Sequence, residues 1–237
     1  MNIVILGGGE SGTGAAVLAK KQNYSVFLSD AGTIPQKYKE DLIAHQIDFE
    51  ENTHSLDIIL AADEIIKSPG LAESTAIMQK IRQQHIPVVS EIEFVSKYTD
   101  AIIVGITGSN GKTTTTMLVN HILNEGGLHL GMAGNIGDSY AKMVAENNFD
   151  YYVLEISSFQ LDGIKDFRPH IAIITNITPD HLDRYDYRFE NYIASKFRIT
   201  MNQTAEDYFI YDADDEVLVE WLTKNPIKSK LLPFSLN

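Results

Sequence analysis

Short apolar runs alternate with longer segments of helical periodicity along most of this chain. The runs predict strands at residues 3–6, 25–29, 65–67, 88–89, 102–106, 152–156, 171–175 and 208–211. The periodic segments predict helices at residues 13–22, 35–45, 74–84, 113–125 and 190–201. These strands are too apolar to face water on either side, so the alternation indicates an α/β fold in which helices cover parallel sheets.

A glycine-rich turn between an apolar run and a helical segment occurs first at residues 7–12, Gly-Gly-Gly-Glu-Ser-Gly. This spacing, with Asp30 closing the next predicted strand, is typical of Rossmann-like dinucleotide-binding domains. The glycines would admit a diphosphate, and the acid would hold ribose hydroxyls. The pattern does not distinguish NAD, FAD and a UDP-sugar, and a tight turn without a ligand is the alternative. Glu10 departs from the pattern, because its carboxylate would repel a phosphate unless it points away.

The second such turn is Thr-Gly-Ser-Asn-Gly-Lys-Thr at residues 107–113. Gly108 and Gly111 allow close approach of an oxyanion, Lys112 adds a positive charge, and the Thr113 hydroxyl is a ligand for Mg²⁺. The general phosphate-loop pattern is not met, because Ile106 stands where its first glycine would be. A turn without nucleotide is again the alternative. We predict ATP and Mg²⁺ as cofactors, with the ATP-binding residues Gly108, Ser109, Asn110, Gly111, Lys112, Thr113 and Thr114.

The two strand–glycine–helix starts predict two domains. We expect a Rossmann-like domain at residues 1–91 and a P-loop-containing ATP-binding α/β domain at residues 92–237. The last residues, 231–237, resemble the beginning of a further strand. The second domain is therefore expected to be truncated.

Composition excludes several classes of function. The 32 acidic residues outnumber the 19 basic ones, and the net charge of −13 argues against a non-specific nucleic-acid surface. No apolar run is long enough to span a membrane, and the first residues form a strand rather than a signal peptide. The chain has no cysteine, which excludes disulfides and thiolate metal sites and is compatible with the cytoplasm, where we place the protein.

Other polar residues follow predicted strands. Glu155 ends an apolar run opposite the phosphate loop and is the expected second Mg²⁺ anchor, with a helix-capping role as its alternative. Residues 68–70, Ser-Pro-Gly, form a rigid turn at a strand end. His181 follows another strand and is a candidate metal ligand or phosphate contact. Lys196 lies in a predicted helix, and a surface position is its default interpretation.

In this order, the motifs resemble the Mur ligase family, the ATP-dependent enzymes that add amino acids to the UDP-muramyl peptide of bacterial cell walls. The resemblance spans essentially the whole chain. Its most selective part is residues 154–161, Leu-Glu-Ile-Ser-Ser-Phe-Gln-Leu, which is similar to the branch that adds D-glutamate. The resemblance also rests on residues 107–113 and 134–137, and on Glu155, Asp180, His181 and Lys196.

The resemblance implies an ATP-dependent amide ligase that adds D-glutamate to UDP-N-acetylmuramoyl-L-alanine through an acyl phosphate. Such a reaction serves peptidoglycan precursor synthesis, and with it cell shape and division. A C-terminal amino-acid-binding domain would be absent here, leaving a monomeric fragment that is inactive alone. The alternatives are another Mur ligase-like enzyme, a folylpolyglutamate synthetase-like enzyme, or a nucleotide-sugar-binding module without catalysis.

The same resemblance assigns roles to individual residues. Lys112, Glu155, His181 and Lys196 would be catalytic, with Lys112 on the ATP phosphates. Thr113 and Glu155 would hold one Mg²⁺, and His181 a second together with Lys196 after CO₂ has converted it to a carbamate. The UDP-substrate residues would be Gly9, Ser11, Gly12, Asp30, Ser68, Gly70, Asn135, Ser157 and His181. Glu10 and the pair Ala31-Gly32 depart from the family's usual pocket.

Overall fold

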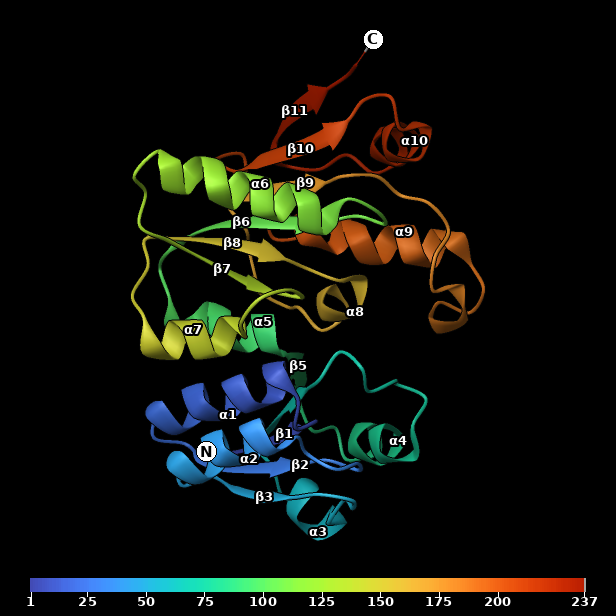
Figure 1. Cartoon of the computed structure of the whole chain (residues 1–237). Coiled ribbons are helices and arrows are strands. Elements are labelled where there is room, and N and C mark those ends of the chain that lie inside the picture. Colours follow the sequence, from blue (N-terminus) through green and yellow to red (C-terminus); the bar gives the residue numbers. More distant parts are fainter. Residues whose placement is uncertain (237) are drawn as a thin grey trace. The chain divides into compact units, whose positions relative to one another are not determined.

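The computed structural model describes residues 1–236 and divides the chain into two compact units (Figure 1). The first comprises Met1–Thr99, Asp138–Asn148 and Gly163–Lys165. The second comprises Asp100–Gly137, Phe149–Asp162 and the residues from Asp166 onward. Each unit contains a parallel sheet with helices on its faces, which confirms the predicted α/β class. No helix in the described part of the chain is long and apolar enough to cross a membrane.

The first unit contains a five-stranded sheet in the order β3-β2-β1-β4-β5, with every pair parallel. Its strands are β1 (Asn2–Leu6), β2 (Ser25–Ser29), β3 (Asp48–Glu50), β4 (Glu64–Lys67) and β5 (Val88–Ser90). Its helices are α1 (Glu10–Lys21), α2 (Gln36–Ala44), α3 (Leu56–Ile59), α4 (Ala76–Gln83), α5 (Glu91–Val95) and α7 (Tyr140–Glu146), with a 3₁₀ turn at Ser96–Tyr98. Helices α3 and α4 pack their apolar side chains on β1 and β4, while α1 packs against α2, α5 and α7.

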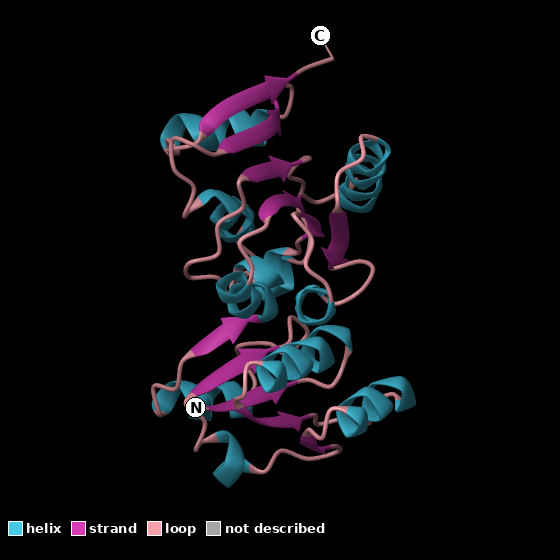
Figure 2. Ribbon diagram, turned by 90° about the vertical axis from the view of Figure 1, so that its left-hand side faces the viewer, coloured by secondary structure: helices cyan, strands magenta, loops and turns pink. Residues whose placement is uncertain are grey.

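The second unit contains a six-stranded parallel sheet in the order β11-β10-β9-β6-β8-β7 (Figure 2). Its strands are β6 (Ile102–Thr107), β7 (Leu130–Gly134), β8 (Tyr151–Glu155), β9 (Ile171–Ile174), β10 (Tyr208–Asp212) and β11 (Lys230–Phe234). Its helices are α6 (Lys112–Glu125), α8 (Ser158–Leu161), α9 (Phe189–Phe197) and α10 (Glu216–Lys224), with 3₁₀ turns at Leu182–Arg184 and Arg198–Thr200. Side chains of α6 pack on Val104, Ile106 and Val153, and the stacked rings of Phe197 and Trp221 join α9 to α10.

The division into units differs from the expected boundary between residues 91 and 92. The first unit continues to Thr99 and takes in α7, which lies after the phosphate loop in sequence. Helix α7 belongs there because its N-cap, Ser139, donates its hydroxyl to Glu91 at 2.6 Å. Gly14 of α1 lies so close to this N-cap that a Cβ at Gly14 would be 1.9 Å from the Ser139 hydroxyl oxygen. These contacts join segments that are far apart in sequence.

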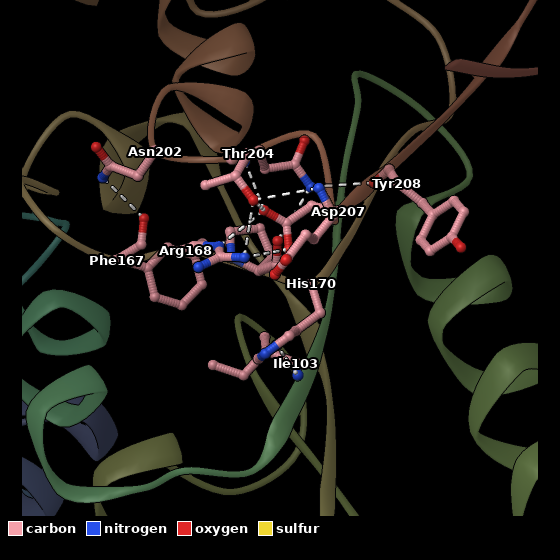
Figure 3. Close-up of polar contacts among 11 residues, drawn as sticks. Ile103, Phe167, Arg168, His170, Asn202, Thr204, Asp207 and Tyr208 are labelled. Atoms are coloured by element: carbon pink, nitrogen blue, oxygen red, sulfur yellow. Dashed lines mark hydrogen bonds and ion pairs between the residues drawn. The ribbon is translucent and has the colours of Figure 1, made fainter. Parts of the chain in front are cut away.

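An ion pair fixes the loops that lead into two strands of the second unit (Figure 3). Arg168, just before β9, donates from Nε and Nη2 to the two carboxylate oxygens of Asp207 at 2.7 and 2.9 Å. The same guanidinium also donates to the Thr204 hydroxyl at 3.0 Å. Asp207 is buried, whereas the Arg168 side chain is 37% exposed. A bidentate ion pair of this kind fixes the relative orientation of its two residues as well as stabilising them, so it holds the starts of β9 and β10 in register.

We predict that Asp207→Asn lowers the free energy of unfolding by about 1–2 kcal/mol, because an amide cannot accept both guanidinium hydrogen bonds. Burial raises the pKa of Asp207, but the bonds from Arg168 and Thr204 outweigh it and leave the pKa below its usual value. The stabilisation is therefore present above the ordinary aspartate range of about pH 4 and is lost as the pH falls through the lower folded value. Urea titrations at several pH values measure this. The control is Glu206→Gln, which neutralises a neighbouring exposed carboxylate, and an equal loss in both variants would contradict the prediction.

Candidate nucleotide-binding sites

The phosphate loop of the second unit connects β6 to α6, and its two glycines are required by the backbone. Gly111 is the N-cap of α6 and has a left-handed conformation with φ of +79°. Gly108 has φ of +149°, and a Cβ there would lie 2.0 Å from the Thr175 hydroxyl oxygen. No side chain caps α6, so its first N–H groups are available to an anion. The loop therefore has the backbone geometry of an oxyanion site.

Residues that follow β9 hold this loop in place. The Ser109 hydroxyl donates to the Thr178 carbonyl at 2.9 Å, and the Asn110 N–H donates to Asn176 Oδ1 at 3.0 Å. The Thr175 hydroxyl donates to the Asn110 carbonyl at 2.7 Å. Because these hydrogen bonds already hold the loop from the side of the residues after β9, the loop requires little reorganisation when an anion binds to its free N–H groups.

Two lysines share one carbonyl oxygen in this loop. Lys112 Nζ donates to the Gly108 and Ser109 carbonyls at 2.9 and 3.0 Å, and Lys196 Nζ donates to the Gly108 carbonyl at 2.7 Å. Lys196 is not on the surface, since only 2% of it is exposed. Burial, with the charge of Lys112 as a second cause, lowers the pKa of Lys196 to about 7. Near neutral pH a large share of Lys196 is therefore the uncharged amine.

Three of the predicted residues meet at the end of β8. Glu155 is buried, and its two carboxylate oxygens accept from the Thr113 hydroxyl at 2.7 Å and from Asn135 Nδ2 at 2.8 Å. Gly134 has φ of +109° and passes so close that a Cβ would lie 2.2 Å from the Glu155 carbonyl oxygen. A hydroxyl and a carboxylate at this separation are hard oxygen donors suited to Mg²⁺. Ser157 is instead the N-cap of α8, in a capping box with Gln160.

His181 is not part of a preformed group of metal ligands among the described residues. Its side chain is 54% exposed, with Nε2 3.5 Å from Asp180 Oδ2 and its ring centroid 5.3 Å from that of Phe159. Within residues 1–236, no three histidine, aspartate or glutamate side chains are grouped so as to hold a metal. The candidate metal ligands are therefore in two places, with Thr113 and Glu155 in one and His181 in the other.

In the first unit, the glycine loop connects β1 to α1. A Cβ at Gly12 would lie 1.9 Å from the Gly7 carbonyl oxygen, so this position requires glycine. Gly9 is the N-cap of α1. Burial raises the pKa of Glu91, and the nearby Ser11 hydroxyl opposes that shift. The Glu10 carboxylate accepts from the Tyr38 hydroxyl at 2.7 Å, which directs it toward α2 and removes the concern that it would face a phosphate.

Asp30 at the end of β2 shapes this loop. One of its carboxylate oxygens accepts from the Gly8 N–H at 2.6 Å and the other from the Gly32 N–H at 2.7 Å. The sequence pattern suggested only a ribose contact for this acid. The structure shows that Asp30 also holds the two loops around the carboxyl ends of β1 and β2.

A cavity of about 260 Å³ opens beside Asp30. Its lining includes Leu6, Asp30, His54, Ser68, Gly70 and Leu71. It therefore brings together three predicted residues, Asp30, Ser68 and Gly70, and Gly7 of the glycine loop also lines it. The predicted residues Gly9, Ser11 and Gly12 lie at the N-terminal end of α1. His54 was not predicted, because it lies in a polar segment after β3 that carries no motif.

The low pKa of Lys196 predicts a distinctive pH dependence of stability. Between pH 7 and 10.5 the unfolded chain binds more of this proton than the folded chain, so the free energy of unfolding should rise with pH. Relative to Lys196→Met, the wild type should gain on the order of a few kcal/mol across that window. Chemical denaturation at a series of pH values tests this, with exposed Lys228→Met as the control. Parallel curves for wild type and Lys196→Met would refute it.

Comparisons with known proteins find family matches in both parts of the chain. The family model described as the MurD N-terminal domain matches residues 2–77, and the one described as the Mur ligase middle domain matches residues 106–237. A curated relative from Christiangramia forsetii, named UDP-N-acetylmuramoylalanine–D-glutamate ligase, is 62% identical over 99% of this chain and 53% of its own length. A relative of the same name from Bacteroides fragilis is 54% identical over 98% of this chain and 52% of its own.

Solved structures show the same fold at low identity. UDP-N-acetylmuramate:L-alanyl-gamma-D-glutamyl-meso-diaminopimelate ligase from Neisseria meningitides has a TM-score of 0.69 at 20% identity, covering 98% of this chain and 77% of that chain. UDP-N-acetylmuramate-alanine ligase from Thermotoga maritima has a TM-score of 0.61 at 22% identity, covering 93% and 51%. The chain spans about half the length of the curated relatives it matches. By its sequence, and by a middle-domain match over more than half its length, the chain belongs to the Mur ligase family.

Proposed function

We propose that this chain is the nucleotide-binding part of an ATP-dependent ligase that adds D-glutamate to UDP-N-acetylmuramoyl-L-alanine. The observation that carries the proposal is the group of Lys112, Thr113 and Glu155 at the N-terminus of α6, in a chain that also has a glycine loop and cavity in its first unit. The names of the relatives supply the substrates. Peptidoglycan precursor synthesis, a cytoplasmic location and a monomeric state are part of the proposal.

The phosphate loop would hold ATP. The N–H groups of Gly111, Lys112 and Thr113 at the uncapped start of α6 would bind phosphate oxygens, and Lys112 would leave its carbonyl partners for the β- and γ-phosphates. Gly108, Ser109, Asn110 and Thr114 complete this set. Thr113 and Glu155 fit one Mg²⁺, because both are oxygen donors and already lie within hydrogen-bond distance. Bound there, the ion would neutralise phosphate charge.

His181 and Lys196 are the proposed residues for a second Mg²⁺. The pKa of about 7 supports a role for Lys196 that a surface lysine could not have. Its neutral amine can attack CO₂, forming an N–C bond and losing one proton, which leaves an anionic carbamate with oxygen donors. The buried surroundings that lower the pKa favour the neutral amine that this reaction requires, and a bound Mg²⁺ would offset the negative charge of the carbamate.

The reaction would have two steps. The alanyl carboxylate attacks the γ-phosphorus of ATP, which forms an acyl phosphate and releases ADP. The amine of D-glutamate then attacks the acyl carbon, forms the amide and releases phosphate. Lys112 and the N-terminus of α6 would stabilise the negative charge on the transferred phosphoryl group, where preorganised positive charge contributes most.

The UDP part of the substrate would occupy the first unit. Gly9, Ser11 and Gly12 would face the diphosphate at the start of α1, and Asp30, Ser68 and Gly70 would surround the nucleoside in the cavity. Asn135, Ser157 and His181 of the second unit remain proposed contacts for the rest of the substrate. In the structure the side chains of Asn135 and Ser157 already have internal partners, so each would have to share or exchange a hydrogen bond.

We predict that this chain binds UDP more tightly than NAD. The cavity beside Asp30 has a volume of about 260 Å³, just below the range of roughly 300–1,000 Å³ for ligand sites. It suits one nucleoside better than the two of a dinucleotide. Isothermal titration of the chain with each ligand measures both affinities. Tighter binding of NAD would count against the proposed function.

We also predict that Lys112→Ala weakens Mg-ATP binding by about 10- to 100-fold, the size of a lost charge-assisted hydrogen bond. UDP affinity should stay within about twofold, because independent sites behave additively. Calorimetry with both ligands tests this, and Lys228→Ala, an exposed lysine of the same unit, is the control. Equal loss of both ligands, with the fold intact by circular dichroism, would contradict separate sites.

A further inference from the structure

His54 has a position in the first unit that neither the glycine loop nor the family motifs explain. It lies beyond β3 and lines the cavity with Asp30 and Ser68. Two backbone bonds join its segment to the loop after β2: the Asn52 N–H donates to the Gly32 carbonyl at 2.9 Å, and the Thr53 N–H donates to the Asp30 carbonyl at 3.3 Å. The segment that carries His54 is thus part of the cavity wall.

A hydrogen-bond chain determines which ring nitrogen of His54 carries a hydrogen. The Ser29 hydroxyl has one hydrogen and donates it to Glu50 Oε1 at 2.7 Å. Burial raises the pKa of Glu50, but hydrogen bonds from Ser55 and Ser29 lower it by more, so this carboxylate is ionised and only accepts. Ser29 Oγ also lies 2.6 Å from His54 Nδ1. Since the Ser29 hydrogen is already used, that contact requires a hydrogen on Nδ1.

In the neutral ring, a hydrogen on Nδ1 leaves Nε2 as a hydrogen-bond acceptor. Nε2 has no partner among residues 1–236, whereas Nδ1 is bound to the buried Ser29. The neighbouring positions Ala31 and Gly32 offer no polar side chain. The acceptor on His54 is therefore a polar group of the cavity lining that a ligand can still satisfy.

The order of strands indicates which part of a nucleotide reaches His54. In doubly wound sheets the diphosphate lies at the helix after the first strand, and the acid after the second strand holds the ribose. Here these are α1 and Asp30, and β3 is the edge strand beside β2. A group that lies beyond the ribose, toward β3, is the base.

We propose that His54 determines the base specificity of this cavity by accepting a hydrogen bond at Nε2 from the imide N3–H of a uracil ring. The inference rests on the proposed binding of a uridine nucleotide in the first unit. The glycine loop cannot discriminate between bases, because every nucleoside diphosphate presents the same diphosphate to α1. The inference assigns this discrimination to His54. Cytosine would be rejected, since its N3 is itself an acceptor and would face the lone pair of Nε2.

The test compares UDP, CDP, N3-methyl-UDP and 2′-deoxy-UDP by calorimetry on this chain, at about pH 8. The wild type should prefer UDP to CDP and to N3-methyl-UDP. His54→Ala should weaken UDP by about five- to tenfold, the effect of one neutral hydrogen bond, and the other two bases by less than about twofold. The control is His45→Ala, which should change nothing. His45 is the C-cap of α2 in the same unit and is bound to the Asp41 carbonyl.

Every other outcome of this experiment overturns either the inference about His54 or the proposed function. If the wild type binds UDP but His54→Ala weakens all base variants equally, or none, the inference is overturned and the proposed function stands. Selective loss of discrimination against 2′-deoxy-UDP would place His54 on the ribose and also overturn it. Failure of the wild type to bind UDP would instead overturn the proposed function. Nitrogen-15 spectra of the free chain give an independent test, because an unprotonated Nδ1 on His54 would refute the hydrogen-bond chain.

Discussion

Parallel pairing of every strand is the constraint on which both sites depend. A parallel pair must be joined by a crossover, so the carboxyl ends of all strands in a sheet lie at one edge and the loops there gather from distant parts of the sequence. In the second unit this brings Thr113 after β6 to Glu155 at the end of β8. In the first unit it brings the glycine loop after β1 to Asp30 after β2 and to Ser68 after β4. Both candidate sites therefore depend on this topology, because no single segment of the sequence contains all the residues of either site.

Two lysine side chains meet at one point of a chain whose net charge is strongly negative. With a net charge of −13, the protein cannot attract polyphosphate through its overall field. The second unit instead directs Lys112 and the buried Lys196 toward the carbonyl oxygen of Gly108. Their mutual repulsion adds to the effect of burial on the pKa of Lys196.

The elements that could be predicted are those whose local sequence is unambiguous. The apolar strands at 3–6, 102–106 and 152–156 and the helix after residue 112 lie where their periodicity indicated. Strand β3, Asp-Phe-Glu, has a single apolar residue and exists because it pairs with β2. Helix α7 and the placement of Lys196 depend on contacts with residues far away in sequence, which periodicity does not contain. The two hydrogen bonds that Asp30 accepts from the Gly8 and Gly32 N–H groups could not be predicted from the sequence for the same reason.

The comparisons separate what the fold determines from what individual side chains determine. Proteins of 20% identity share the arrangement of strands and helices with a TM-score of 0.69, so the architecture tolerates replacement of most side chains. The glycines tolerate least, since a Cβ at Gly12 or Gly108 would clash with the backbone or with Thr175. In the proposed function, these positions would allow phosphate to approach, and the cavity wall beyond β2 and β3 would select the group attached to it. At Ala31 and Gly32 that wall has no polar side chain, so recognition of the attached group would fall to side chains such as His54, which is bound to Ser29 of β2, itself bound to Glu50 of β3.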